Sequence, residues 1–277
     1  MINKETLLCY YVVMKRLIFT DLDGTFLNHH NYAFDESFEA LKKIKEAGIP
    51  LIFTTSKTKS EVELLQEKVG ISEPFIVENG AAFFIPENYQ GLDLSILNGY
   101  EDKKIMLFGQ PYSRILNFYR LYKEEYGMLG MSDMSDAKVG ELTGLAQGSV
   151  FLAKQRDFSE PFIMKDESKL QELTELAKGY ELKITKGGRF YHLMGELQDK
   201  GIAVIETIEL FERLYNEKVY SMALGDSEND LPMLERVDLP IVIQKHDGSY
   251  LETGLEKTEK STYEGSKGWN EMVLKYV

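Results

Sequence analysis

The stretch Lys15-Arg16-Leu17-Ile18-Phe19-Thr20-Asp21-Leu22-Asp23-Gly24-Thr25 decides the fold. Its apolar part ends at Asp21 and enters a turn that contains Gly24, which is typical of a buried strand that feeds a loop. The next segments alternate in the same way and predict helices at about 35–47 and 61–69 and strands at 49–54 and 75–77. Strands that alternate with helices indicate parallel pairing with right-handed crossovers.

The same alternation returns late in the chain. It predicts helices at about 200–215 and 231–237 and strands at 220–224 and 239–243. We assign these elements to the other half of the same sheet. The order of residues between the two halves is less regular and includes a glycine-rich stretch at 140–148.

These patterns predict an α/β protein with a parallel, Rossmann-like sheet and an inserted α+β cap domain. The expected sheet domain consists of residues 14–84 and 195–277, and the expected cap domain of residues 85–194. Met14 directly precedes the first strand. We therefore expect residues 1–13 to be an N-terminal appendage.

The composition excludes several classes of protein. The chain has 277 residues, 43% of them apolar, and a net charge of −13, so general affinity for nucleic acid or an anionic membrane is not expected. Its single cysteine excludes an internal disulfide and favours a reducing compartment such as the cytoplasm. The apolar run at 7–13 lacks a signal-peptide cleavage site, and no run approaches the ~20 apolar residues of a membrane span. We expect a small-molecule partner, and a monomer or a weak homodimer.

Polar side chains follow the predicted strands at the edge where open α/β sheets bind ligands. They are Asp21 and Asp23 after the first strand, Thr54, Thr55, Ser56 and Lys57 after the second, Gly225 to Asp230 after a late strand, and Lys200 at the start of a late helix. Carboxylate oxygens suit Mg²⁺, which also binds phosphate. A hydroxyl and an ammonium can hold the oxygens of a phosphate, and Asp23 can protonate a leaving alkoxide and then deprotonate water. The sequence therefore predicts phosphate-ester chemistry, with Asp21 as the nucleophile.

These motifs resemble those of the haloacid dehalogenase superfamily of phosphatases. In this chain they read Asp21-Leu22-Asp23-Gly24-Thr25, Thr55, Lys200 and Gly225-Asp226-Ser227-Glu228-Asn229-Asp230. The resemblance implies an aspartyl-phosphate on Asp21, Asp23 as acid and base, and Mg²⁺ as the cofactor. It also implies metal binding by Asp21, Asp23, Asp226 and Asp230, and phosphate binding by Thr55, Ser56, Lys200 and Asn229.

Within that superfamily the chain is similar to the mannosyl-3-phosphoglycerate phosphatases. Many sugar phosphatases read Thr-Gly-Arg after the second strand, whereas this chain reads Thr55-Ser56-Lys57-Thr58, and the similarity extends to residues 78–81, 154–162 and 187–193. An arginine binds a carboxylate through two parallel hydrogen bonds, so Arg156 and Arg189 are candidates for the carboxylate of a glycosylated phosphoglycerate. The full set of implied substrate contacts is Glu78, Asn79, Arg156, Glu160, Lys186, Gly187, Gly188, Arg189 and His192.

The expected reaction is hydrolysis of 2-O-(α-D-mannosyl)-3-phosphoglycerate to mannosylglycerate and phosphate, which in that family completes the synthesis of a compatible solute. A glucosyl-3-phosphoglycerate or a sucrose-phosphate type of substrate stays open. A non-catalytic sugar-phosphate sensor is the alternative from another class, and the presence of Asp23 beside Asp21 argues against it. A dinucleotide-dependent oxidoreductase is disfavoured because no G-x-G-x-x-G follows the first strand.

Overall fold

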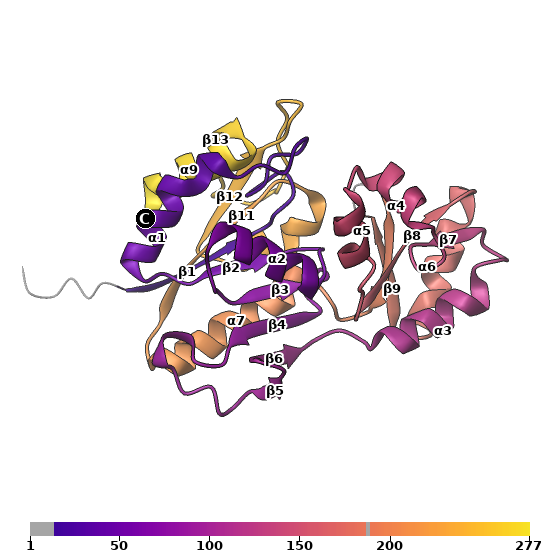
Figure 1. The fold of residues 1–277 in the computed structure, drawn as a ribbon, viewed down its shortest axis with the longest axis horizontal. Helices are drawn as coiled ribbons and strands as arrows, with labels where there is room; N and C mark the ends of the chain where they lie inside the picture. Colours follow the sequence, from indigo (N-terminus) through magenta and orange to yellow (C-terminus); the bar gives the residue numbers. More distant parts are fainter. Residues whose placement is uncertain (1–13, 187–188) are drawn as a thin grey trace, which may run out of the picture.

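A computed structural model describes residues 14–186 and 189–277 (Figure 1). The predicted appendage at 1–13, and Gly187 and Gly188, lie outside the described residues. The described chain forms a nine-stranded sheet in the order β13-β12-β11-β1-β2-β3-β4-β6-β5 and a four-stranded sheet in the order β7-β8-β10-β9. The two sheets lie at opposite ends of an elongated molecule (Figure 1).

The larger sheet is parallel from β13 to β3 and antiparallel from β3 to β5. Strand β1 lies between β11 and β2, so the stretch that opens the sequence is central to the sheet. The predicted α/β fold with a parallel sheet is confirmed. The strands are β1 (Lys15–Thr20), β2 (Leu51–Thr54), β3 (Phe75–Val77), β4 (Ala82–Pro86), β5 (Asn98–Tyr100), β6 (Lys103–Leu107), β11 (Val219–Gly225), β12 (Leu239–Gln244) and β13 (Glu259–Glu264).

Helices cover both faces of this sheet. One face packs against apolar residues of α1 (Phe38–Ala47), α2 (Lys59–Val69) and α9 (Gly265–Tyr276), and the other against α7 (Lys200–Tyr215) and α8 (Leu231–Leu234). Helix α9 was not predicted, yet its Trp269 is fully buried and its indole N–H donates to Thr20 Oγ1 at 3.0 Å. Short 3-10 helices are η2 (Asp35–Ser37), η3 (Tyr89–Gly91), η4 (Glu167–Lys169) and η5 (Glu228–Asp230).

The larger sheet continues beyond the predicted start of the insertion at residue 85. Strands β4, β6 and β5 extend it through an antiparallel meander that reaches Leu107. Antiparallel neighbours need no crossover helix, so the alternation of strand and helix in the sequence stops before the sheet does. The division into domains at residues 84 and 194 stays a prediction.

The smaller sheet is entirely antiparallel and consists of β7 (Met128–Gly130), β8 (Ser159–Met164), β9 (Leu182–Lys186) and β10 (Tyr191–Gly195). Helices α3 (Tyr112–Tyr122) and α6 (Leu170–Lys178) pack on one face, and α4 (Asp136–Thr143) and α5 (Gln147–Ala153) contribute to a separate apolar cluster with Ile163 of β8. We call the described part of residues 112–195 the cap, and the rest of the described chain the core.

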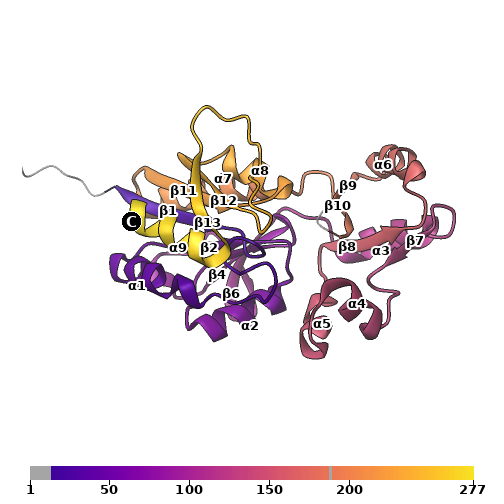
Figure 2. The same ribbon diagram turned by 90° about the horizontal axis from the view of Figure 1, so that it is seen from above.

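The cap is joined to the core by the segments between β6 and α3 and between β10 and α7 (Figure 2). Hydrogen bonds also bridge the two parts. Thr58 Oγ1 donates to the Leu152 carbonyl at 3.0 Å, and the Tyr32 hydroxyl to the Thr143 carbonyl at 3.4 Å. The cap therefore contacts the edge of the core at which β1 and β2 end. Among the described helices, none combines the length and the apolar character that crossing a membrane requires.

Candidate active site

Strand β1 places Asp21 at the carboxyl edge of the core sheet. The Asp21 N–H donates to the Leu224 carbonyl at 2.9 Å, so the backbone pairing with β11 continues to this residue. The following turn requires Gly24, because its φ is +82° and a Cβ there would lie 2.7 Å from Asp226 Oδ2. Thr25 Oγ1 donates to Asp226 Oδ1 at 3.1 Å. This turn thus brings the segment Asp21 to Thr25 into contact with the Asp226 carboxylate.

Helix α7 presents Lys200 to Asp21 from the first helical position. Asp199 caps this helix by accepting from the Ile202 N–H at 2.8 Å. The Lys200 ammonium lies 2.6 Å from Asp21 Oδ1 and 2.6 Å from Asp230 Oδ1, and its side chain is fully buried. Burial alone would lower the pKa of Lys200, but these two carboxylates raise it above its usual range. Lys200 is therefore a fixed positive charge between two aspartates.

The turn after β3 supports the start of α7. Glu78, Asn79 and Gly80 have φ values of +47°, +58° and +90°, three left-handed residues in succession. A Cβ on Gly80 would lie 2.1 Å from the Asp199 carbonyl oxygen, so glycine is required for this contact. The turn sets the position of the residue directly before Lys200.

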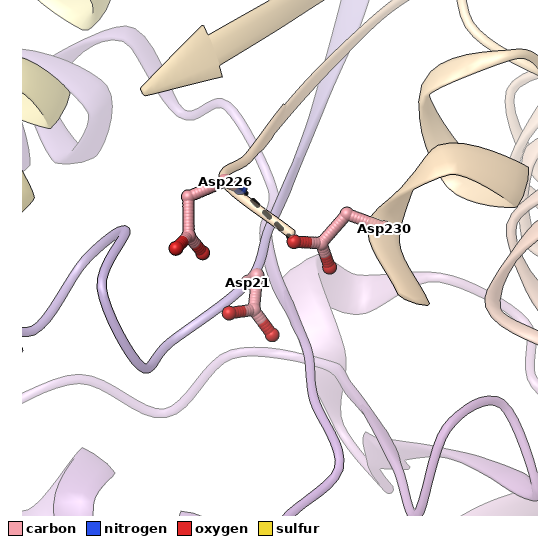
Figure 3. A group of neighbouring side chains, drawn as sticks. All are labelled: Asp21, Asp226 and Asp230. Carbon is pink, nitrogen blue, oxygen red and sulfur yellow. Dashed lines mark hydrogen bonds between the residues drawn. The ribbon is translucent and has the colours of Figure 1, made fainter. Parts of the chain in front are cut away.

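Three buried or nearly buried carboxylates converge at this edge (Figure 3). One oxygen each of Asp21, Asp226 and Asp230 lies within 4.8 Å of the others. Burial first, and then the charge of Asp230, raise the pKa of Asp21 to about 7 and the pKa of Asp226 well above its ordinary value. Proximity of like charges in a buried place favours either protonation or a bound cation.

The donor set fits Mg²⁺, which prefers carboxylate oxygens. Both oxygens of Asp230 already accept hydrogen bonds: Oδ1 accepts from Lys200, and Oδ2 from the Asp226 and Ser227 N–H groups at 3.0 and 3.1 Å. Among the described residues, Asp21 and Asp226 each keep one oxygen that receives no donor. Those two oxygens are the ones best placed for a cation, and Asp230 holds Lys200 and the last motif in place.

The predicted phosphate-binding residues are linked through main-chain and amide contacts. The Thr55 N–H donates to the Ile76 carbonyl at 3.0 Å, and the Thr55 carbonyl accepts from the Asn79 N–H at 2.9 Å. Asn229 Nδ2 donates to Asn79 Oδ1 at 3.2 Å. The loop after β2, the turn after β3 and the last motif are therefore joined at one edge, where Thr55 is buried.

Asp23 forms an ion pair with Lys57, which the sequence places in the polar cluster after the second strand but to which we had assigned no catalytic or binding role. Its Oδ2 lies 2.9 Å from the Lys57 ammonium, whereas its Oδ1 is buried and has no hydrogen-bond partner among the described residues. The available signal was the sequence Thr55-Ser56-Lys57, in which lysine stands where many sugar phosphatases have arginine.

Glu78 and Arg156 tie the cap to the core. The buried Glu78 carboxylate accepts from the Asp157 N–H at 2.9 Å and from Ser159 Oγ at 2.5 Å. Arg156 lies 3.9 Å from Glu78 and donates to the Ser56 carbonyl at 2.7 Å and to the Ala153 carbonyl at 2.9 Å. These contacts give both side chains a place between cap and core, and the predicted substrate contacts of both stay predictions.

Glu160 and His192 lie inside the cap. Glu160 is buried and accepts from the Ser132 N–H and hydroxyl at 2.9 and 2.8 Å, and also from the Tyr112 hydroxyl. His192 is buried, and its Nδ1 has no hydrogen-bond partner among the described residues. Burial first, and the charge of Arg156 second, lower the pKa of His192 to about 3, so its imidazole is neutral at physiological pH.

Lys186 is the last residue of β9 and Arg189 lies two residues before β10, and both are exposed. The Lys186 ammonium lies 5.4 Å from the centre of the Tyr191 ring, and Arg189 donates to the Leu142 carbonyl. These two contacts are within the cap, but the charge of Arg189 also acts on His29 and Tyr32 of the core. The predicted role of Lys186 and Arg189 in substrate binding stays a prediction. The same prediction for Gly187 and Gly188 falls outside the described residues.

Comparison with known proteins agrees with this arrangement. The profile of the haloacid dehalogenase-like hydrolases matches residues 18–249. A glucosyl-3-phosphoglycerate/mannosyl-3-phosphoglycerate phosphatase of Persephonella marina is 47% identical over 94% of this chain and 97% of its own length. A protein of the same name from Methanococcoides burtonii is 39% identical over 95% and 98%. A solved structure from Thermoplasma acidophilum, 18% identical, has the same fold, with a TM-score of 0.68 over 95% of this chain and 98% of its own. The chain therefore belongs to the haloacid dehalogenase-like hydrolase family.

Proposed function

We propose that this chain is a Mg²⁺-dependent phosphatase of 2-O-glycosyl-3-phosphoglycerates, with the mannosyl and the glucosyl esters as substrates. It would release the glycosylglycerate and phosphate. The observation that carries the proposal is the position of Lys200, 2.6 Å from both Asp21 and Asp230 in a fully buried place. Support for the substrate class comes from the two relatives, 47% and 39% identical, whose names include both sugars.

Charge explains why the nucleophile needs these neighbours. A carboxylate that approaches a phosphate dianion meets a repulsion of about 4 kcal/mol per charge pair at 4 Å, if the effective dielectric constant is about 20. Without compensation, about 8 kcal/mol would slow the reaction by a factor on the order of 10⁵ to 10⁶. Lys200 offsets part of this repulsion because its ammonium touches the attacking carboxylate.

Asp21 and Asp23 divide the chemistry between them. In the first step an Asp21 oxygen attacks phosphorus, and the C3 oxygen of the glycerate leaves with a proton from Asp23. In the second step Asp23 takes a proton from water while that water attacks the aspartyl-phosphate, and phosphate leaves Asp21. Oδ2 of Asp23 is paired with Lys57, and its buried Oδ1 has no hydrogen-bond partner among the described residues, so Oδ1 would carry the proton once the substrate reaches it.

The remaining residues bind and orient. Asp21, Asp226 and the main-chain carbonyl of Asp23 would hold Mg²⁺, which supplies positive charge to the phosphate oxygens. The buried Thr55 hydroxyl and the following N–H, that of Ser56, can bind the other phosphate oxygens. Asp230 and Asn229 keep Lys200 and the turn after β3 in position.

Phosphate release from a panel of esters tests this proposal. The panel contains mannosyl- and glucosyl-3-phosphoglycerate, sucrose phosphate and simple sugar phosphates, each with Mg²⁺ and with a chelator. We expect the two glycosyl-phosphoglycerates to be hydrolysed at least tenfold faster than the other esters, and only with the metal. Equal turnover of all esters would refute the substrate class, and activity retained in Asp21→Asn would refute the nucleophile.

A further inference from the structure

Lys57 is held in a defined place beside the general acid. Its N–H donates to Thr55 Oγ1 at 3.2 Å, and its carbonyl accepts from the Glu78 N–H at 3.0 Å, so the backbone is fixed on both sides. Its ammonium lies 2.9 Å from Asp23 Oδ2, 4.0 Å from Glu61 Oε1 and 5.3 Å from the centre of the Tyr32 ring.

The Lys57 ammonium is positively charged. Two carboxylates stabilise this charge, those of Asp23 at 2.9 Å and Glu61 at 4.0 Å. An ammonium has three N–H donors, and Asp23 occupies one of them at close range. Lys57 can therefore hold Asp23 and a second anion at the same time.

The neighbouring cations have less freedom to bind a substrate. The Lys200 side chain is 0% exposed and contacts two aspartates, and the Arg156 side chain is 7% exposed with donors directed at the Ser56 and Ala153 carbonyls. The Lys57 side chain is 14% exposed beside Asp23, whose side chain is 43% exposed. Of these three cations, Lys57 is the most open to the space in front of the acid.

We propose that Lys57 binds the carboxylate of the leaving glycerate group and thereby selects phosphate esters that carry an acid group close to the reacting oxygen. This inference rests on the proposed function and identifies the residue that binds the glycerate part of the substrate. It also replaces Arg156 as a candidate for that carboxylate, because the donors of Arg156 are directed at main-chain carbonyls; Arg189 was the other candidate drawn from the sequence.

The dimensions of the substrate agree with this placement. The leaving C3 oxygen must lie within about 3 Å of Asp23 to receive a proton. Three carbon atoms separate that oxygen from the carboxylate oxygens, a reach of about 3 to 5 Å at ordinary bond lengths. Since the Lys57 ammonium is 2.9 Å from Asp23 Oδ2, a carboxylate at that reach can come within hydrogen-bond distance of the ammonium.

A comparison of two substrates in two enzymes tests the proposal. The substrates are mannosyl-3-phosphoglycerate and its C1 carboxamide, which has the same shape and no negative charge at that end. The enzymes are wild type and Lys57→Met. A charge-assisted hydrogen bond to the carboxylate should make the loss of kcat/KM in Lys57→Met about 10- to 150-fold larger for the acid than for the amide.

The ratio of the two losses removes any effect of Lys57 on Asp23, because that effect is common to both substrates. Lys57→Arg, which keeps the charge, should retain most of the preference for the acid and covers the case in which Lys57→Met does not fold. Lys59→Met is the matched control, since Lys59 pairs with Glu63 and Glu101 at the start of α2 and should leave the ratio unchanged.

Two results would overturn the inference. Equal losses for acid and amide in Lys57→Met would show that Lys57 acts on Asp23 alone. Equal turnover of acid and amide by the wild type would show that the enzyme does not recognise the carboxylate. Failure of the wild type to hydrolyse the acid at all would instead refute the proposed function, and with it this inference.

Discussion

Replacing Asp21, the proposed nucleophile, should stabilise the metal-free protein, and the gain should grow with pH. Burial first, and the charge of Asp230 second, raise the pKa of Asp21 from 3.8 to about 7. Between these values the native state binds more protons at this position than the unfolded state does. Wild-type stability therefore falls as pH rises through this window, and the loss is complete above pH 7. Asparagine has nearly the same shape as aspartate and cannot ionise, so the stability of Asp21→Asn should not fall with pH in this way.

The size of this stabilisation follows from the same two pKa values. One pKa unit is worth 1.36 kcal/mol, so the displacement from 3.8 to about 7 corresponds to about 4 kcal/mol. Because the three neighbouring carboxylates titrate together, we assign about 2 to 4 kcal/mol to Asp21 itself. For a chain of this size, that free energy raises Tm by about 5 to 15 °C at pH 8. At pH 5 the difference should be about a third as large.

Thermal unfolding of wild type and Asp21→Asn in a chelator, at pH 5 and pH 8, measures this effect. Adding Mg²⁺ at pH 8 should raise the Tm of wild type more than that of the variant, because the cation relieves the repulsion among the carboxylates. Asp35→Asn, at an exposed position, is the control and should show no such gain. A Tm difference that is the same at both pH values, or a variant less stable than wild type at pH 8, would refute the reasoning.

Three further substitutions separate the roles of the site. Lys200→Met removes the cation between two buried carboxylates, so kcat for phosphate release should fall by about 10³-fold or more; a loss below tenfold would contradict its role. Gly24→Ala places a Cβ 2.7 Å from Asp226 Oδ2 at a φ of +82°, so activation should require at least tenfold more Mg²⁺, and an unchanged requirement would argue against metal binding by Asp226. Arg156→Met should raise KM equally for mannosyl-3-phosphoglycerate and its carboxamide, because Arg156 binds main-chain carbonyls; a larger loss for the acid would favour Arg156 as the carboxylate ligand.

The convergence of Asp21, Lys200 and Asp230 could be predicted because it depends on backbone geometry. Each residue stands at the end of a parallel strand or the start of a helix, and such positions meet at one edge of an α/β sheet whatever the side chains do. The alternation of strands and helices is visible in the sequence, and the parallel order β11-β1-β2-β3 follows it. The residues proposed to carry the chemistry are therefore the ones that local patterns reveal best.

The meander of β4, β5 and β6 and the ion pair between Lys57 and Asp23 could not be predicted in the same way. The short strand β5 has the sequence Asn98-Gly99-Tyr100, which has no apolar alternation, and its pairing depends on β6. The direction of the Lys57 side chain depends on Asp23 and Tyr32, which belong to an earlier part of the chain, and not only on Glu61, four residues further on. Neither feature has a local pattern from which it follows.

The places of Arg156 and Lys57 imply different effects on the substrate. Arg156 donates to the Ala153 carbonyl of the cap and the Ser56 carbonyl of the core. Binding a substrate carboxylate there would therefore break contacts that join the two parts. Lys57 belongs to the same loop as Thr55 and Ser56, and binding a carboxylate there requires no bond between cap and core to break. Thr55 would bind the phosphate and Lys57 the carboxylate, and both residues belong to one loop. The enzyme would therefore select substrates by the distance between their two anionic groups. Esters with that spacing should be favoured whichever sugar they carry, which agrees with relatives named for both the glucosyl and the mannosyl compounds.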